Sequence, residues 1–312
     1  MKFAFVFPGQ GSQSVGMLNS WQDQPDVQRL LSRANNALGS DLSGLIAQGP
    51  IESLNLTTNT QPAMLVAGLA AHAAWVAAGG PVPALMAGHS LGEYAALTAA
   101  GSLKLEDAVR LVRIRADAMQ AAVPVGMGAM AAILGLDDEA IRAACESAAE
   151  GQVVEAVNFN APNQVVIAGH EAAVERAMVL AKSAGAKRAI RLPVSAPFHS
   201  SLIKPAADVL AQALGQVDVS VCAVPVIHNV DVQIHASADE IRVALVSQAW
   251  HAVQWVRTIQ AMRAAGITHI VECGPGKVLA GLVKRIDPEL TGLSVADPES
   301  LQQALDTLAS NS

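Results

Sequence analysis

The pentapeptide Gly88-His89-Ser90-Leu91-Gly92 lies between a short apolar run, 84–87, and a helix-like run, 93–100. This order predicts a strand, a sharp turn and a helix, an arrangement that lifts a serine hydroxyl clear of the end of a sheet. The turn also places Ser90 at a helix N-terminus, where free N–H groups favour developing negative charge. The pattern therefore favours an α/β fold with Ser90 as nucleophile; a glycine turn with a capping serine is the alternative.

The rest of the chain predicts a parallel sheet whose strands alternate with helices. Residues 3–7 form a continuous apolar run, as expected for a central parallel strand that is buried on both faces. Helical segments fill much of 26–80. Further strands are expected near 221–227, 268–272 and 292–296, and further helices at 105–122, 238–248, 253–265, 277–286 and 298–309.

Residues 128–194 predict a second folding unit. Strands at 128–134, 152–159, 164–168 and 187–194 alternate with helices after the capping residue Asp137 and at 170–184. The order β-α-β-β-α-β is the ferredoxin-like pattern, and proline-containing segments flank it. We therefore expect an α/β-hydrolase-like catalytic domain with a parallel sheet core, formed by residues 1–125 and 198–312, and an inserted ferredoxin-like subdomain of residues 126–197.

Composition excludes several other classes of protein. The net charge of −7 argues against general nucleic-acid binding. The apolar run after Met1 is too short for a signal peptide, and no apolar span is long enough to cross a membrane. Three widely spaced cysteines suggest neither a zinc site nor a disulfide framework. We expect a cytoplasmic protein with no metal.

A serine nucleophile needs a base, and His199 is the best placed of the eight histidines. It stands where the inserted unit returns to the main domain, and it follows Ser90 in the chain, as the histidine does in α/β-hydrolases. Asp208 and Asp231 are candidates for the acid of a triad by chain order alone. A dyad whose imidazole is oriented by a backbone carbonyl would need no acid.

Arg115 occupies an unusual position on the predicted helix 105–122. At 100° per residue, one helix face is apolar, and a second carries charges that can pair at i,i+4, Glu106 with Arg110 and Arg113 with Asp117. Arg115 projects instead from the opposite flank, among apolar residues. Its guanidinium either snorkels to water or pairs with a buried anion.

Six segments together resemble the malonyl-CoA:acyl carrier protein transacylases of fatty acid synthesis. The resemblance runs from residue 3 to about 305, and the set is far more specific than any one of its members. The segments are 5–13 (FVFPGQGSQ), 88–94 (GHSLGEY), Arg115, 157–160 (VNFN), 198–199 (FH) and 272–277 (ECGPGK).

The resemblance implies a role for each matching residue. Ser90 would be the acylated nucleophile and His199 the general base and then acid. Arg115 would bind the free carboxylate of the malonyl group. The resemblance also supplies supporting roles: backbone N–H groups of an oxyanion hole at Gln10 and Leu91, a carbonyl that orients His199 at Gln248, and a ring that crowds α-branched substrates at Phe198.

The implied substrates are malonyl-CoA and acyl carrier protein, with no cofactor and with no nucleic acid or membrane as partner. Carrier proteins of this kind are acidic, so docking would need a local basic patch on this acidic chain. Two clusters could supply it: Lys187, Arg188 and Arg191, or Lys277, Lys284 and Arg285.

Other activities would use the same serine and histidine. A malonyl transferase for another carrier, in malonate decarboxylase or a trans-acting polyketide synthase, would look nearly identical. A serine thioesterase would deliver water instead and would have no use for Arg115. A non-catalytic module that binds the carrier would not need Ser90, His199 and Arg115 together.

Overall fold

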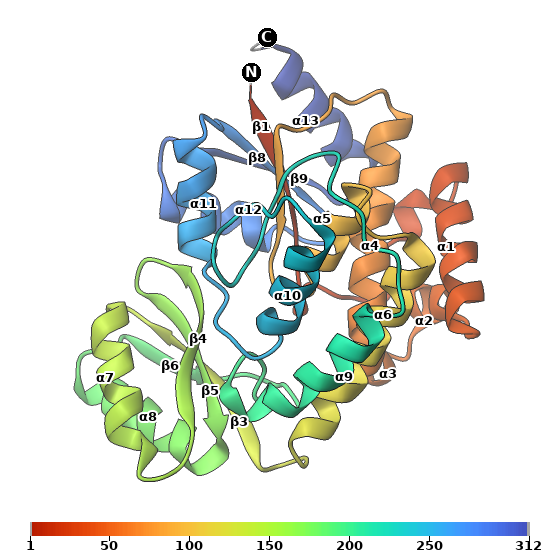
Figure 1. The fold of residues 1–312 in the computed structure, drawn as a ribbon. Helices are drawn as coiled ribbons and strands as arrows, with labels where there is room; N and C mark the ends of the chain where they lie inside the picture. Colours follow the sequence, from red (N-terminus) through yellow and green to blue (C-terminus); the bar gives the residue numbers. More distant parts are fainter. Residues whose placement is uncertain (1, 311–312) are drawn as a thin grey trace.

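The main sheet has five parallel strands in the order β7-β2-β1-β8-β9 (Figure 1). The computed structural model describes residues 2–310. In chain order the strands are β1 (Phe3–Phe7), β2 (Leu85–Gly88), β7 (Val226–Ile227), β8 (His269–Cys273) and β9 (Thr291–Val295). Because all strands run in one direction, the loops after β1, β2, β7 and β8 emerge at the same edge, where ligands bind in open α/β sheets.

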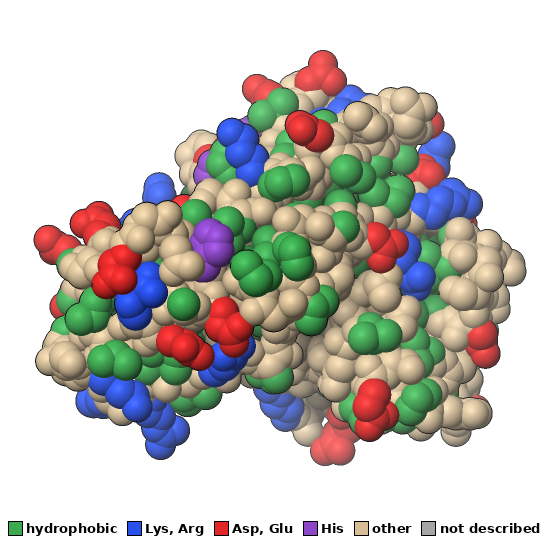
Figure 2. All heavy atoms as spheres, turned by 90° about the horizontal axis from the view of Figure 1, so that it is seen from below, with side chains coloured by type: hydrophobic (Ala, Val, Ile, Leu, Met, Phe, Trp, Pro, Cys, Tyr) green, Lys and Arg blue, Asp and Glu red, His purple; other side chains and the backbone are tan. Residues whose placement is uncertain are grey.

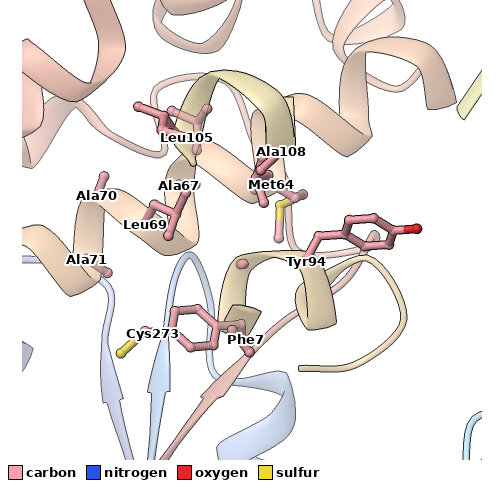
Figure 3. Packing of buried hydrophobic residues seen from close by; sticks show 14 of the residues in the cluster. Phe7, Met64, Ala67, Leu69, Ala70, Ala71, Tyr94, Leu105, Ala108 and Cys273 are labelled. Carbon is pink, nitrogen blue, oxygen red and sulfur yellow. The ribbon is translucent and has the colours of Figure 1, made fainter. Parts of the chain in front are cut away.

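The alternation of side chains along β1 explains why both faces of the sheet are covered. Phe5 and Phe7 point to the face covered by α4 (Thr57–Ala77) and α5 (Gly92–Ala99). Val6 points to the other face, against α11 (Trp255–Ala264) and α12 (Val278–Ile286). Figure 3 shows Phe7 and Cys273 of the sheet beneath α4, with Tyr94 of α5 beside them.

Helix α4 is apolar around most of its circumference because further helices cover its outer side. It packs against α1 (Pro25–Leu38) and α6 (Leu105–Ala122) as well as against the sheet. The remaining helices are α2 (Leu42–Gln48), α3 (Ile51–Leu54), α9 (Lys204–Leu214), α10 (Ala238–Gln248) and α13 (Pro298–Ser310), with short 3-10 turns at Asn19–Trp21 and Ser201–Ile203.

A separate antiparallel sheet of four strands, in the order β4-β5-β3-β6, forms the second unit. It lies apart from the main sheet in Figure 1, coloured yellow to green. Its elements follow one another as β3 (Gly128–Leu134), α7 (Asp138–Ala149), β4 (Val154–Ala161), β5 (Gln164–His170), α8 (Glu171–Ser183) and β6 (Arg188–Arg191). The two helices and the sheet enclose a hydrophobic core of their own.

Strand β4 attaches this second unit to the segment before α11 of the main domain. The Phe159 N–H donates to the Val253 carbonyl at 3.0 Å, and the Val253 N–H donates to the Val157 carbonyl at 2.8 Å. The Asn160 side chain lies 2.8 Å from Nε2 of His89, the residue before Ser90. The second unit is therefore joined to the main domain directly beside the predicted nucleophile.

The expected mixed α/β fold, with a parallel and a separate antiparallel sheet, is confirmed. Two local expectations are wrong. The strand expected at 221–227 is only Val226–Ile227, and helix α9 was not expected. Helix α9 buries Ala206, Leu210 and Leu214, a spacing of four that the sequence does contain.

On the face shown in Figure 2, hydrophobic side chains gather near the middle, and charges of both signs lie around them. None of the helices described between residues 2 and 310 is long and apolar enough to cross a membrane.

Candidate active site

Ser90 stands on a strained turn between β2 and α5. Its φ of 54° lies in the left-handed region that residues other than glycine rarely adopt. The flanking glycines are required by space: a Cβ at Gly88 would lie 1.9 Å from the Gly92 backbone, and a Cβ at Gly92 would lie 2.0 Å from the Phe7 carbonyl oxygen. The predicted strand, turn and helix are therefore confirmed, and both glycines are required because the turn leaves no room for a Cβ.

His199 is within hydrogen-bond distance of the Ser90 hydroxyl. Its Nε2 lies 2.6 Å from Ser90 Oγ, and its Nδ1 lies 2.9 Å from the main-chain carbonyl oxygen of Gln248. Because a carbonyl can only accept, Nδ1 carries the proton and Nε2 is free to accept from the serine. Burial, together with the charge of Arg115, lowers the pKa of His199 to about 3, so the imidazole is neutral near pH 7.

Neither acid that chain order suggested completes a triad. Nδ1 of His199 is already bound to the Gln248 carbonyl, Asp208 is exposed, and Asp231 pairs with His235 at 3.0 Å. The arrangement is a serine–histidine dyad with a backbone acceptor in the place of the acid.

Arg115 is 1% exposed, so the snorkelling interpretation is wrong. Its Nη1 donates to Gln61 Oε1 at 2.8 Å, and its Nη2 donates to Gln248 Oε1 at 2.9 Å and to Ser90 Oγ at 3.1 Å. Burial lowers its pKa. No carboxylate of the described residues forms an ion pair with it, so the site holds a buried guanidinium that is fixed by neutral groups beside the nucleophile.

The loop after β1 lies against the turn that carries Ser90. A Cβ at Gly9 would be 2.7 Å from the His89 carbonyl oxygen, and the Gln10 side chain accepts from Thr57 Oγ1 at 2.9 Å. Within residues 2–310 the backbone N–H groups of Gln10 and Leu91 have no hydrogen-bond partner. Both are therefore available to an oxyanion.

A cleft of about 370 Å³ leads to His199 between the two units. On one side the cleft is lined by residues of helix α7 and strand β4 of the second unit. On the other side it is lined by Ser201, Trp250 and His251 of the main domain. Phe198 is buried next to His199, in a hydrophobic cluster with Met119, Met130 and Val157. Within the described chain, no group of three His, Cys, Asp or Glu side chains could hold a metal ion.

Sequence reasoning missed Gln61, Glu93 and Asn229. Gln61 lies in the buried helix α4, where a polar residue on an apolar helix was the available signal. Glu93 follows Gly92 and looks like an ordinary acid of a first helical turn. Asn229 follows the very short β7, so no periodic pattern marked it.

The two basic clusters differ in how freely they can act. Arg191 is paired with Glu171 and Glu175, whereas Lys277, Lys284 and Arg285 are exposed and form no ion pair within the described chain. Arg285 donates to Gln164, the first residue of β5.

Comparison with known proteins gives consistent results along the whole chain. Residues 4–289 match the model of the acyl transferase domain family. The chain is 55% identical to the malonyl CoA-acyl carrier protein transacylase of Escherichia coli K12 over 306 residues, covering 98% of this chain and 99% of that protein. It is 46% identical to the Bacillus subtilis transacylase over 309 residues, covering 98% and 97%.

Solved structures agree with the sequence comparison. A crystal structure of acyl-carrier-protein S-malonyltransferase from Burkholderia pseudomallei 1710b superposes with a TM-score of 0.97 at 59% identity, covering 98% of this chain and 100% of that one. A malonyl-transacylase in complex with its type II polyketide synthase acyl carrier protein also has a TM-score of 0.97, at 50% identity and with the same coverage. The chain therefore belongs to the acyl transferase family and, within it, to the malonyl-CoA:acyl carrier protein transacylases.

Proposed function

We propose that this chain transfers a malonyl group from malonyl-CoA to the phosphopantetheine thiol of acyl carrier protein, supplying fatty acid synthesis. Its relatives carry this activity in their names. The observation that carries the proposal is Arg115, a buried guanidinium 3.1 Å from Ser90 Oγ with no carboxylate partner in the described chain. A substrate with a free carboxylate close to its thioester supplies the missing partner.

In the first half-reaction, Ser90 Oγ attacks the thioester carbonyl while His199 Nε2 takes the hydroxyl proton. The backbone N–H groups of Gln10 and Leu91 donate to the oxyanion. The carbonyl of Gln248 holds the imidazole in the required tautomer and stabilises it when it is charged. The tetrahedral intermediate collapses, His199 returns the proton to the sulfur, and coenzyme A leaves as a thiol.

In the second half-reaction, the thiol of the carrier attacks the malonyl-serine ester. His199 now takes the thiol proton and gives it to Ser90 Oγ, so the serine is regenerated. Arg115 binds the malonyl carboxylate throughout, and the ring of Phe198 disfavours substrates with an α-methyl group. These residues account for the reaction without a cofactor.

The same proposal extends to domain organisation and location. Residues 1–125 and 198–312 would form an α/β-hydrolase-like catalytic domain, supported by a parallel sheet with a nucleophile turn after β2. Residues 126–197 would form a ferredoxin-like subdomain, supported by the element order of the second unit. The cytoplasmic location inferred from composition stays a prediction.

A second carrier is supported by one observation. The transacylase found in complex with a type II polyketide synthase carrier is 50% identical to this chain. Transfer to a carrier of that class is therefore the alternative function, and it uses the same chemistry. A thioesterase is disfavoured because it gives Arg115 no role.

Intact mass after mixing with malonyl-CoA tests the proposal. We expect one malonyl adduct, mapped to Ser90, that is discharged by fatty acid synthase carrier protein. Ser90→Ala should fold and form no adduct, and His199→Ala should acylate about 10²–10⁴-fold more slowly because the general base is missing. An adduct on Ser90→Ala would overturn the assignment, and discharge by a polyketide carrier alone would favour the alternative.

A further inference from the structure

Four buried polar side chains form a network behind Ser90 that the mechanism above does not use in full. These side chains, each at most 1% exposed, are Glu93, His228, Asn229 and Gln248. Buried polar groups are costly unless every hydrogen bond is made. A network whose hydrogen bonds are all made holds its side chains rigidly, so we ask which groups of the site it positions.

The Glu93 carboxylate is the centre of this network. Its Oε1 lies 2.7 Å from His228 Nδ1, and its Oε2 accepts from the Asn229 N–H at 2.9 Å and from Gln248 Nε2 at 3.2 Å. Glu93 reaches neither Ser90 nor His199 nor Arg115 by a hydrogen bond of its own. Its hydrogen bonds reach them only through the two amide residues Gln248 and Asn229, while its negative charge also acts on Arg115 from a distance and partly offsets the effect of burial, which lowers the pKa of that guanidinium.

Gln248 touches all three of the reacting groups. Its carbonyl oxygen accepts from His199, its Oε1 accepts from Arg115 Nη2, and its Nε2 donates to the Ser90 carbonyl at 2.7 Å. Asn229 holds the other side of the same turn. Its Oδ1 accepts from the Ser90 N–H at 2.7 Å, and its Nδ2 donates to the Gly88 carbonyl at 2.6 Å.

Only one orientation of the Gln248 amide satisfies these neighbours. In the observed orientation the oxygen faces a guanidinium, and the NH₂ group faces a carbonyl and a carboxylate. The reversed orientation would place NH₂ against Arg115 and an oxygen against the oxygens of Ser90 and Glu93. The negative charge of Glu93 makes that reversal especially unfavourable, because the repelled oxygen would lie in a dry site.

We propose that Glu93 is a positioning residue that keeps the Gln248 amide oxygen on Arg115 and thereby sets how strongly the site prefers malonyl over acetyl groups. This inference rests on the proposed function, because the preference requires Arg115 to bind a malonyl carboxylate. Without Glu93, the Gln248 amide can turn, and Arg115 Nη2 loses its neutral acceptor. The guanidinium then keeps only its hydrogen bonds to Gln61 and to Ser90 Oγ, and its orientation becomes less well fixed.

Three variants of Glu93 separate geometry from stability, with the rate of serine acylation by malonyl-CoA and by acetyl-CoA as the readout. Glu93→Asp withdraws the acceptor from Gln248 by one methylene, and Glu93→Leu removes it. Both should lower the malonyl-to-acetyl ratio roughly tenfold, the effect of one buried hydrogen bond. Glu93→Gln should restore most of the ratio, because its oxygen can accept from Gln248 while its NH₂ donates to His228 in the other tautomer.

Glu272→Leu is the matched control. Glu272 is another fully buried carboxylate at the same edge of the sheet, but it accepts from the Ala280 N–H and touches neither Gln248 nor Asn229. A loss of folded protein lowers both acylation rates equally, so this variant should keep the wild-type ratio. An unchanged ratio in Glu93→Asp, or a Glu93→Gln ratio as low as that of Glu93→Leu, contradicts the proposal.

Failure of the inference can be told apart from failure of the proposed function. If the wild-type protein forms no malonyl-serine, the proposed function fails. A crystal structure of Glu93→Asp then decides the inference: we expect Gln248 Nε2 to have left the Ser90 carbonyl, and an unmoved amide refutes the positioning role. This variant should still fold. Aspartate keeps the negative charge, and the hydrogen bonds of the carboxylate to His228 and Asn229, at 2.7 and 2.9 Å, are shorter than the one to Gln248, at 3.2 Å, which is therefore lost first.

Discussion

At the residue scale, the chemistry of this site depends on Arg115, a buried cation that forms no ion pair with the described residues. Arg115 is 1% exposed and is held by the oxygens of Gln61, Gln248 and Ser90, all of them neutral. A buried guanidinium without a carboxylate is unfavourable for folding. The proposed function explains why it is kept, since the malonyl carboxylate completes the ion pair only in the loaded site.

Arg115→Ala should therefore lose malonyl transfer and gain relative activity on acetyl-CoA. Malonyl acylation should fall by at least about 100-fold, the scale of a lost charged hydrogen-bonded pair, while acetyl acylation changes much less. Arg115→Lys should be a poor substitute, because one ammonium cannot reproduce the planar fork. Acylation rates measured by mass spectrometry test this, and an equal fall for both substrates would show that Arg115 acts on folding and not on recognition.

Single residues were predictable only where a motif or an odd position marked them. Ser90 was visible from its glycines, and Arg115 from its place on an apolar flank. The partners of surface charges were not. Glu106 pairs with Arg33, 73 positions away, instead of with Arg110, and helix spacing carries no information on such a contact.

At the scale of elements, the site depends on how closely β1 approaches the start of α5. The Phe7 carbonyl oxygen lies where a side chain at Gly92 would begin, 2.0 Å from its Cβ. This close approach brings the loop of Gln10 to the N-terminus of the helix that carries Leu91. Elements with strong periodicity, such as β3 and α6, were predictable to the residue. Helix α9 follows an irregular junction, and its apolar spacing went unrecognised there.

Gly92→Ala should lower the free energy of unfolding by about 1–3 kcal/mol, the cost of forcing atoms into a packed region. It should also lose most serine acylation, because the turn has to move away from β1. Gly281→Ala is the matched control: Gly281 lies within α12 and a Cβ there meets nothing within 4 Å. That variant should gain roughly 0.5–1 kcal/mol from helix propensity and keep its activity. Urea unfolding of both proteins decides, and wild-type stability in Gly92→Ala contradicts the steric account.

At the scale of the whole molecule, histidines that folding removes wholly or partly from water make stability depend on pH. Burial lowers the pKa of His72 to about 4 and that of His199 to about 3. Well above pH 6.5 both are neutral in the folded and the unfolded chain. As the pH falls below 6.5, the unfolded chain takes up protons that the folded chain refuses, so stability is lost progressively toward the folded pKa values.

His72→Met should reduce this loss. His72 packs against Phe5 at 5.7 Å between ring centroids and has no proposed catalytic role. Between pH 6.5 and 5, the variant should take up fewer protons on unfolding, by up to about one. Its unfolding free energy should therefore fall less steeply with decreasing pH, by up to about 1.4 kcal/mol per pH unit. Urea unfolding at pH 6.5 and 5 measures the slope, and equal slopes in both proteins contradict the prediction.

Charge distribution over the whole molecule bears on the carrier protein. The chain carries −7 overall, so an acidic partner has to meet a local positive surface. The cluster around Lys284 and Arg285 is the better candidate, because Arg191 of the other cluster is already neutralised by Glu171 and Glu175. Helix α12 also packs against β4, which lines the cleft to His199.

Raising the salt concentration should slow transfer to the carrier more than acylation by malonyl-CoA, since charges are screened beyond about 10 Å at 0.1 M. The double variant Lys284→Glu/Arg285→Glu should raise the KM for the carrier and leave serine acylation intact. Arg29→Glu/Lys104→Glu changes the net charge equally, on α1 and before α6, and should change neither step. If Lys187→Glu/Arg188→Glu raises the KM instead, docking occurs on the second unit. If salt affects serine acylation and transfer to the carrier equally, and no charge reversal raises the KM for the carrier, electrostatic docking on either cluster is refuted. Shape rather than charge then selects the carrier.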